Sequence, residues 1–147
     1  MEYNNLIQDF VERTKINLNA IEELKHSGNN VYEVTQFINS LLGMLIFPQQ
    51  EFFKNIPQIS ITEAETDGWI IPNPVGSHKQ VANLSVFLRY LRNAVSHCNI
   101  EVLSKNKEIS GIKVWNISNN GTINWECKFS ITELKSIVTK FHELIKI

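Results

Sequence analysis

The sequence predicts a mainly α-helical fold with one small β-hairpin inserted before the last helix. Apolar residues recur at helical spacing along most of the chain, one short segment alternates apolar and polar residues as a strand does, and a helix-capping sequence follows that segment directly. The 147 residues, 43% of them apolar and 20% charged, suffice for one hydrophobic core. We therefore expect a single domain over 1–147.

Three long helices are expected before the hairpin. The first covers about 2–26 and the second about 31–47, where Pro48 should stop it. The third should run from 77 or 78 to about 97, because apolar residues fall on one face over four turns with no glycine or proline between them.

The stretch 48–77 is the least regular part of the chain. Prolines and glycines punctuate it, and structureless loops of this length are uncommon in compact domains. It contains either a short helix near 49–55 or a functional flap, and the sequence leaves both open. Of the three tryptophans, Trp69 in this stretch is the one that we expect to be most exposed.

The predicted hairpin pairs 112–117 with 123–129 across a turn at 118–121. Alternating apolar and polar residues indicate half-buried strands, and Asn-Gly in the turn is a strong hairpin signal. A third short strand at 100–103 is compatible with the pattern. The capping box Ser130-Ile131-Thr132-Glu133 then opens the last helix, which runs to about 145.

Composition narrows the functional classes. The net charge is −1, so the surface as a whole is not built for nucleic acid, and no apolar run is long enough to cross a membrane. The polar N-terminal start does not resemble a signal peptide, so we expect a cytoplasmic protein. The cysteines Cys98 and Cys127 are expected to be buried thiols, and the four histidines show no metal-ligand spacing, so neither a metal nor a cofactor is predicted.

The arginines direct attention to one segment. The chain has only three, and two of them, Arg89 and Arg92, lie three residues apart in the third helix. In helical projection Arg92 falls at the border of the apolar face. Asn93 and His97 are one turn apart, so their side chains can form a hydrogen bond, and His97 lies where the helix ends.

These residue types allow phosphate chemistry. A histidine titrates near neutrality and can move a proton, and a guanidinium can stabilise charge that grows on phosphate oxygens. Together they suffice for attack by an RNA 2′-hydroxyl without a metal. The alternative is structural: Arg92 pairs with a carboxylate of the helix and His97 caps its C-terminus. Spacing alone favours this alternative.

The run Arg92-Asn93-Ala94-Val95-Ser96-His97 resembles the signature of the HEPN superfamily. In that signature an arginine, usually followed by a polar residue, precedes a histidine at the end of a long helix. The apolar positions of the run match as well, and 41–50 resembles a plasmid-borne branch of HEPN nucleases. The resemblance covers about three helices and is strongest around this run.

The resemblance implies an antiparallel helical bundle that dimerises, so that two Arg92/His97 pairs face each other in one RNase cleft. His97 would then be the catalytic acid and base, Arg92 would stabilise the phosphate, and Asn93 would position them. Other side chains near the motif are expected to bind the substrate: Arg89, Ser96 and Lys79.

The predicted function is accordingly that of a metal-independent endoribonuclease in a toxin or phage-defence role. Its partners would be a second copy of the chain, single-stranded or structured RNA, and an antitoxin or another component of a defence system. A catalytically silent HEPN module that dimerises or binds RNA is the alternative, and the intact arginine, polar residue and histidine favour the enzyme. The sequence departs from the family in two ways. Asn99 stands where HEPN toxins paired with nucleotidyltransferase antitoxins often carry a tyrosine, and the hairpin is an insertion relative to a bare bundle.

Two weaker signals point elsewhere. Glu126 and Lys128 would share one face of a strand, as in the Glu-x-Lys motif of metal-dependent nucleases, but no aspartate falls on a neighbouring predicted strand. Cys98 follows His97 directly, and adjacent residues in a helix or strand point apart, so a thiol nucleophile is not expected.

Overall fold

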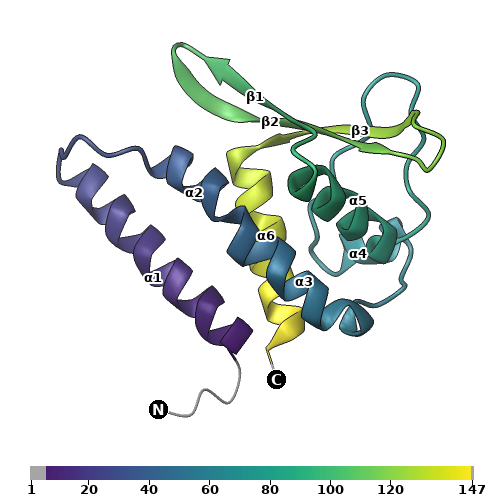
Figure 1. Cartoon of the computed structure of the whole chain (residues 1–147), viewed down its shortest axis with the longest axis horizontal. Helices are drawn as coiled ribbons and strands as arrows, with labels where there is room; N and C mark the ends of the chain where they lie inside the picture. Colours follow the sequence, from purple (N-terminus) through teal and green to yellow (C-terminus); the bar gives the residue numbers. More distant parts are fainter. Residues whose placement is uncertain (1–5, 147) are drawn as a thin grey trace.

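The computed structural model describes residues 6–146, and these residues are mostly helical. The helices are α1 (Leu6–His26), α2 (Glu33–Leu41), α3 (Phe47–Phe52), α4 (Ile61–Thr66), α5 (Leu84–Ser96) and α6 (Ile131–Ile145). The strands are β1 (Ile100–Lys105), β2 (Glu108–Ile117) and β3 (Ile123–Ser130), which form one antiparallel sheet in the order β1-β2-β3. Figure 1 shows the sheet lying across one end of the helices, with α5 directly beside it.

The first predicted helix is present as α1, and the predicted residues 2–5 lie outside the described part of the chain. Val11 and Leu18 are buried on one face of α1. Gly28, with φ +84°, ends the helix in a left-handed conformation, which costs glycine little.

The prediction that Pro48 stops the second helix is wrong. A π-helical turn (Leu42–Ile46) joins α2 to α3, and Pro48 lies in the first turn of α3. Because proline has no N–H, it cannot donate to the carbonyl of Met44 four residues earlier. The imidazole Nε2 of His142 in α6 lies 2.7 Å from that oxygen and donates a hydrogen bond to it.

The irregular stretch contains the short helix that was one of its two predicted alternatives. Residues 49–55 fall in α3 and a 3₁₀ turn (Phe53–Asn55). We did not predict α4, although Ser60 and Glu63 form a capping box in which each side chain bonds the other residue's backbone N–H. The sequence pattern Ser-x-x-Glu was the signal for it.

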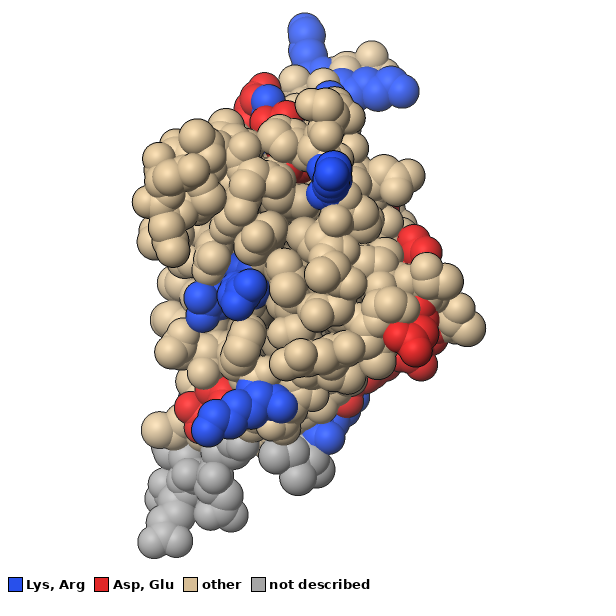
Figure 2. Space-filling model, turned by 90° about the vertical axis from the view of Figure 1, so that its right-hand side faces the viewer, with Lys and Arg blue, Asp and Glu red and all other residues tan. Residues whose placement is uncertain are grey.

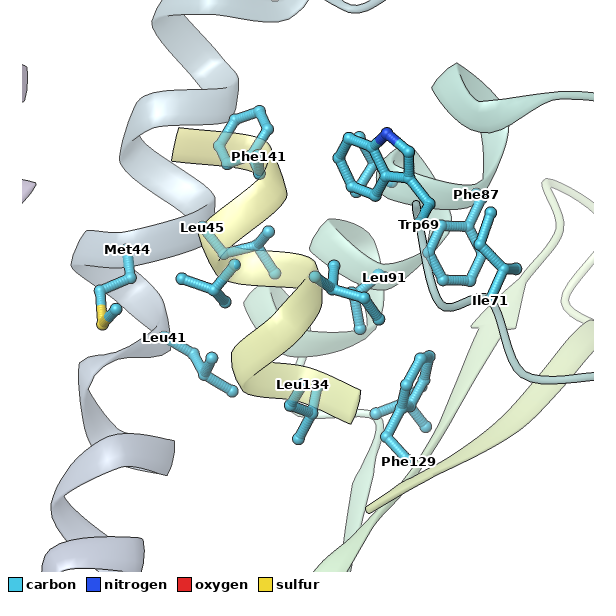
Figure 3. Packing of buried hydrophobic residues seen from close by; sticks show 14 of the residues in the cluster. Leu41, Met44, Leu45, Trp69, Ile71, Phe87, Leu91, Phe129, Leu134 and Phe141 are labelled. Atoms are coloured by element: carbon cyan, nitrogen blue, oxygen red, sulfur yellow. The ribbon is translucent and has the colours of Figure 1, made fainter. Parts of the chain in front are cut away.

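Trp69 is buried, contrary to the prediction. Only 3% of its surface is exposed, and Figure 3 shows it in the same cluster as Ile71 and Phe87. Gly68, with φ +90°, turns the chain at the end of α4, and the Trp69 N–H then donates to Ala64 O at 3.0 Å. This turn directs the indole back onto the core.

The third predicted helix, α5, begins at Leu84 rather than at 77 or 78. The side chain of Asn83 caps it by accepting from the Val86 N–H at 3.0 Å. Before this cap the chain follows the sheet, because the Val75 N–H donates to Glu126 O of β3 at 2.8 Å. The end at Ser96, with His97 as the C-cap, agrees with the prediction.

Both strands of the predicted hairpin are present as β2 and β3, and the third strand at 100–103 is present as β1. The sheet packs its apolar face on α5. On β3, Trp125 and Phe129 are fully buried, and the Trp125 ring lies 6.0 Å from that of Phe87 on α5. Cys127, as predicted, is a buried thiol, and burial raises its pKa to about 12.

Candidate functional site

The guanidinium of Arg92 is held by neutral amide oxygens. Its Nη1 donates to Gln50 Oε1 of α3 at 3.0 Å, and its Nη2 donates to Asn93 Oδ1 at 2.9 Å. Its Nε is buried and has no hydrogen-bond partner among residues 6–146, nor does any described carboxylate form an ion pair with Arg92. The positive charge of Arg92 is therefore oriented but not neutralised within the described part of the chain.

Asn93 is oriented in turn by the sheet. Its Nδ2 donates to Asn116 Oδ1 of β2 at 3.3 Å. Asn116 Nδ2 donates to Asn124 Oδ1 of β3 at 2.8 Å, and Asn124 Nδ2 donates to the hydroxyl of Tyr90 on α5 at 3.2 Å. Each bond fixes which way the next amide faces, so this chain of side chains determines the orientation of Asn93.

His97 ends α5 with an exposed side chain. Its backbone N–H donates to Asn93 O at 2.9 Å, but the side-chain hydrogen bond between Asn93 and His97 that their spacing allows is not formed. The Asn93 amide is engaged with Arg92 and Asn116 instead. The imidazole makes no hydrogen bond to any residue that the structure describes, so it is free to meet a substrate.

The prediction that Cys98 is buried is wrong, because its side chain is exposed. Cys98 adopts a left-handed conformation with φ +56°. Its N–H donates to Val95 O at 3.2 Å and the next N–H, of Asn99, donates to Ala94 O at 2.8 Å, which is the usual bonding of a helix C-terminus closed by glycine. This turn leads the chain from α5 into β1 immediately after His97.

A polar surface hollow lies beside His97. We call it the asparagine hollow, and its volume is about 430 Å³. It lies where the end of α5 meets β2 and the turn after β2. Its lining residues are Asn93, His97, Asn99, Asn116, Ile117 and Asn119.

The predicted substrate-binding residues are placed differently from one another. Arg89 is exposed on α5, with its guanidinium 6.0 Å from the ring of Tyr90. The Ser96 hydroxyl donates to Arg92 O of its own helix at 2.6 Å. Lys79 lies in the segment before α5, outside the helix in which it was predicted. None of the three lines the asparagine hollow.

The sequence did not predict the residues of other helices and strands that hydrogen-bond to the Arg92–His97 run. Gln50 bonds Arg92 from α3, and Asn116 bonds Asn93 from β2. Asn116 carried a signal: it follows Ile112 and Val114 on the face of the strand that alternation assigns to the core, and it is only 5% exposed. A polar residue on a buried face requires a partner, and here that partner is Asn93.

In the part of the chain that it describes, the structure does not place an aspartate beside Glu126 and Lys128, as the Glu-x-Lys motif of a metal-dependent nuclease would require. Glu126 and Lys128 on β3 pair with Trp115 and Lys113 of β2, and β2 contains no aspartate. Within residues 6–146, no group of three or more His, Cys, Asp or Glu side chains is placed so that it could hold a metal ion.

A family model described as HEPN pEK499 p136 matches residues 1–146. The chain belongs to this HEPN family. The match agrees with the resemblance of the Arg92–His97 run, including the plasmid-borne branch. No curated protein and no solved structure matches the chain.

HEPN membership supports a nuclease or an RNA-binding role, and HEPN domains commonly dimerise and act on RNA. In this HEPN chain the signature arginine is held by two amide oxygens, and the signature histidine is exposed beside the asparagine hollow. Across the described residues, no helix combines the length and the apolar character that a membrane span requires.

Proposed function

We propose that this HEPN protein is a metal-independent endoribonuclease in which His97 transfers protons and Arg92 stabilises the phosphate. The observation that carries the proposal is the uncompensated guanidinium of Arg92, which Gln50 and Asn93 hold on the helix that His97 ends with an exposed side chain. A guanidinium without a carboxylate partner keeps its charge available for a phosphate oxygen.

The proposed reaction is attack by the 2′-hydroxyl oxygen on the adjacent phosphorus. An imidazole takes the proton of the 2′-hydroxyl as the new P–O bond forms. The bond from phosphorus to the 5′-oxygen breaks, and that oxygen receives a proton from a second group. The products are a 2′,3′-cyclic phosphate and a free 5′-hydroxyl, and Arg92 would stabilise the charge on the phosphate oxygens in the transition state.

This reaction needs both a base and an acid, whereas one chain offers one imidazole in the motif. A second copy of the chain would supply the other, so the active unit that we propose is a homodimer with His97 of each copy at one cleft.

The distribution of charge also supports a homodimer. Figure 2 shows a face on which charged side chains form separate groups in a largely uncharged surface, and the chain carries a net charge of −1. Two copies of Arg92 at one cleft would double the local positive charge.

The proposed role is that of a toxin or a phage-defence nuclease, acting on cytoplasmic RNA and controlled by an antitoxin or another component of the defence system. The intact signature in a chain that the HEPN family model matches throughout 1–146 supports this role.

A second candidate is a catalytically silent HEPN module that binds RNA or dimerises. One observation favours it: no residue in the described part of the chain hydrogen-bonds to the His97 imidazole. A catalytic histidine is commonly held in one tautomer by a hydrogen bond, and that partner would have to come from the second copy or from RNA.

Comparison of wild type with His97→Ala tests the proposal. We expect the wild-type chain to slow growth of the host when expressed and, once purified, to cleave RNA. His97→Ala should be tolerated and should not cleave. His26→Ala is the matched control, since His26 is an exposed histidine at the end of α1, and it should behave as wild type. RNA binding without cleavage by both wild type and His97→Ala would favour the silent module.

A further inference from the structure

The asparagine hollow has a lining that does not fit a phosphate. Apart from His97, its residues are four asparagines and Ile117, so it contains no lysine, arginine or carboxylate. A phosphate group would be expected to bind where Arg92 offers its charge. A neutral ligand with hydrogen-bonding edges fits the asparagines better.

Two of the four asparagines have uncommitted amides. Asn93 and Asn116 bond each other, whereas the side chains of Asn99 and Asn119 make no hydrogen bond to any residue between 6 and 146. Each of these amides therefore offers one acceptor oxygen and two donor hydrogens to a ligand.

The backbone around both free amides is fixed. Asn99 donates its N–H to Ala94 O at 2.8 Å and accepts from the Trp115 N–H at 3.2 Å, so it is tied to both α5 and β2. Asn119 lies in a turn that two hydrogen bonds close, from Ser118 N to Thr122 O at 2.8 Å and from Gly121 N to Ser118 O at 2.9 Å. Because the backbone is held in this way, only the side-chain torsions of the two asparagines remain to be ordered when a ligand binds.

We propose that the asparagine hollow binds one nucleobase of the RNA beside the bond that is cleaved, and that the amides of Asn99 and Asn119 recognise its hydrogen-bonding edge. This inference rests on the proposed function, because it assigns a substrate subsite next to His97. A volume of about 430 Å³ falls in the range of small-molecule sites. Ile117, which is 44% exposed, offers an apolar surface to the face of the base.

The base that we expect to bind best is adenine. An asparagine amide pairs with adenine through two parallel hydrogen bonds, accepting from the amino group at N6 and donating to N7. The absence of charge in the lining, His97 apart, also fits a base better than the ribose phosphate, which would remain with Arg92.

The test is titration of the full chain with the four nucleoside 3′-monophosphates, followed by NMR. We expect 3′-AMP to bind most tightly, and Asn99→Ala and Asn119→Ala each to weaken it about tenfold, as loss of a paired amide contact would. Asn39→Ala, an exposed asparagine on α2, is the matched control and should bind as wild type. Inorganic phosphate should bind equally to all four proteins. Unchanged 3′-AMP binding by both hollow variants would overturn the proposal, provided that their thermal unfolding matches wild type.

Mapping of cleavage sites separates this inference from the reaction itself. If wild type cleaves RNA and both hollow variants cut at the same bases with the same preference, the base subsite is refuted while the nuclease proposal stands. If no protein cleaves RNA but 3′-AMP binding depends on Asn99 and Asn119, the reaction is refuted and the base subsite stands.

Discussion

His142 gives a quantitative prediction for the pH dependence of stability. Its side chain is 2% exposed, and its Nε2 donates to Met44 O, the carbonyl four residues before Pro48. Nε2 therefore carries the proton, and Nδ1 is buried with no partner among the described residues. Burial lowers the pKa of His142 from 6.5 to about 4, against the smaller opposing effect of the hydrogen bond to Met44.

The sign and size follow from proton linkage. Between about pH 6.5 and pH 4 the unfolded chain binds a proton at this histidine and the folded chain does not, so stability falls as the pH falls through this range. With these two pKa values, the free energy of unfolding at about pH 5 should be on the order of 2 kcal/mol lower than at about pH 7.5.

Urea denaturation of wild type and His142→Gln at both pH values measures this loss. The glutamine amide can still donate to Met44 O but does not titrate. Between the two pH values, the free energy of unfolding should therefore fall by about 2 kcal/mol less in His142→Gln than in wild type. The exposed carboxyl groups of Glu63 and Glu101, whose pKa values are lowered by hydrogen bonds, act equally in both proteins and cancel in the comparison. Equal losses in wild type and variant would refute the reasoning.

Four further outcomes are expected. Asn116→Ala removes the acceptor of Asn93 Nδ2 and the donor to Asn124 Oδ1, so it should destabilise the fold by about 1–3 kcal/mol in urea denaturation and slow RNA cleavage, and an unchanged cleavage rate would show that Asn93 needs no support from the sheet. Cys98→Gly should stabilise the fold by about 1 kcal/mol, because the residue has φ +56°, and a lower midpoint in the same assay would contradict this. RNA cleavage should continue in EDTA and leave 2′,3′-cyclic phosphate ends detectable by mass spectrometry, whereas activity that returned only with magnesium would exclude the proposed chemistry. Light scattering should show a dimer, and mixing wild type with an excess of inactive His97→Ala protein should lower the activity per wild-type chain, because a mixed dimer carries only one of the two imidazoles, while a fully active monomer would rule out the composite site.

Much of the secondary structure was predictable because local interactions decide it. The capping box of Ser130 and Glu133 opens α6 as expected, and β2 and β3 pair across the Asn-Gly turn. The Arg92–His97 run lies at the end of its helix for the same reason: apolar periodicity carries α5 to that point, and no residue within it interrupts the helix.

Other features depended on residues distant in the sequence. Pro48 lies in the first turn of α3, and the Met44 carbonyl four residues before it accepts a hydrogen bond from His142, 94 residues beyond Pro48 in the chain. Just before the segment that was predicted to be helical, Pro74 and Val75 pair with β3, a contact that apolar spacing alone could not reveal.

The residues of the motif were visible in the sequence, but their partners were not. The sequence determined that an arginine, an asparagine and a histidine stand together at the end of a long helix. Only the packing of the sheet on α5 brought Asn116 to Asn93 and placed Asn99 and Asn119 around the same hollow. Hydrogen bonds between side chains on different elements depend on where the elements meet in space, so they produce no periodic pattern of residues from which the sequence could predict them.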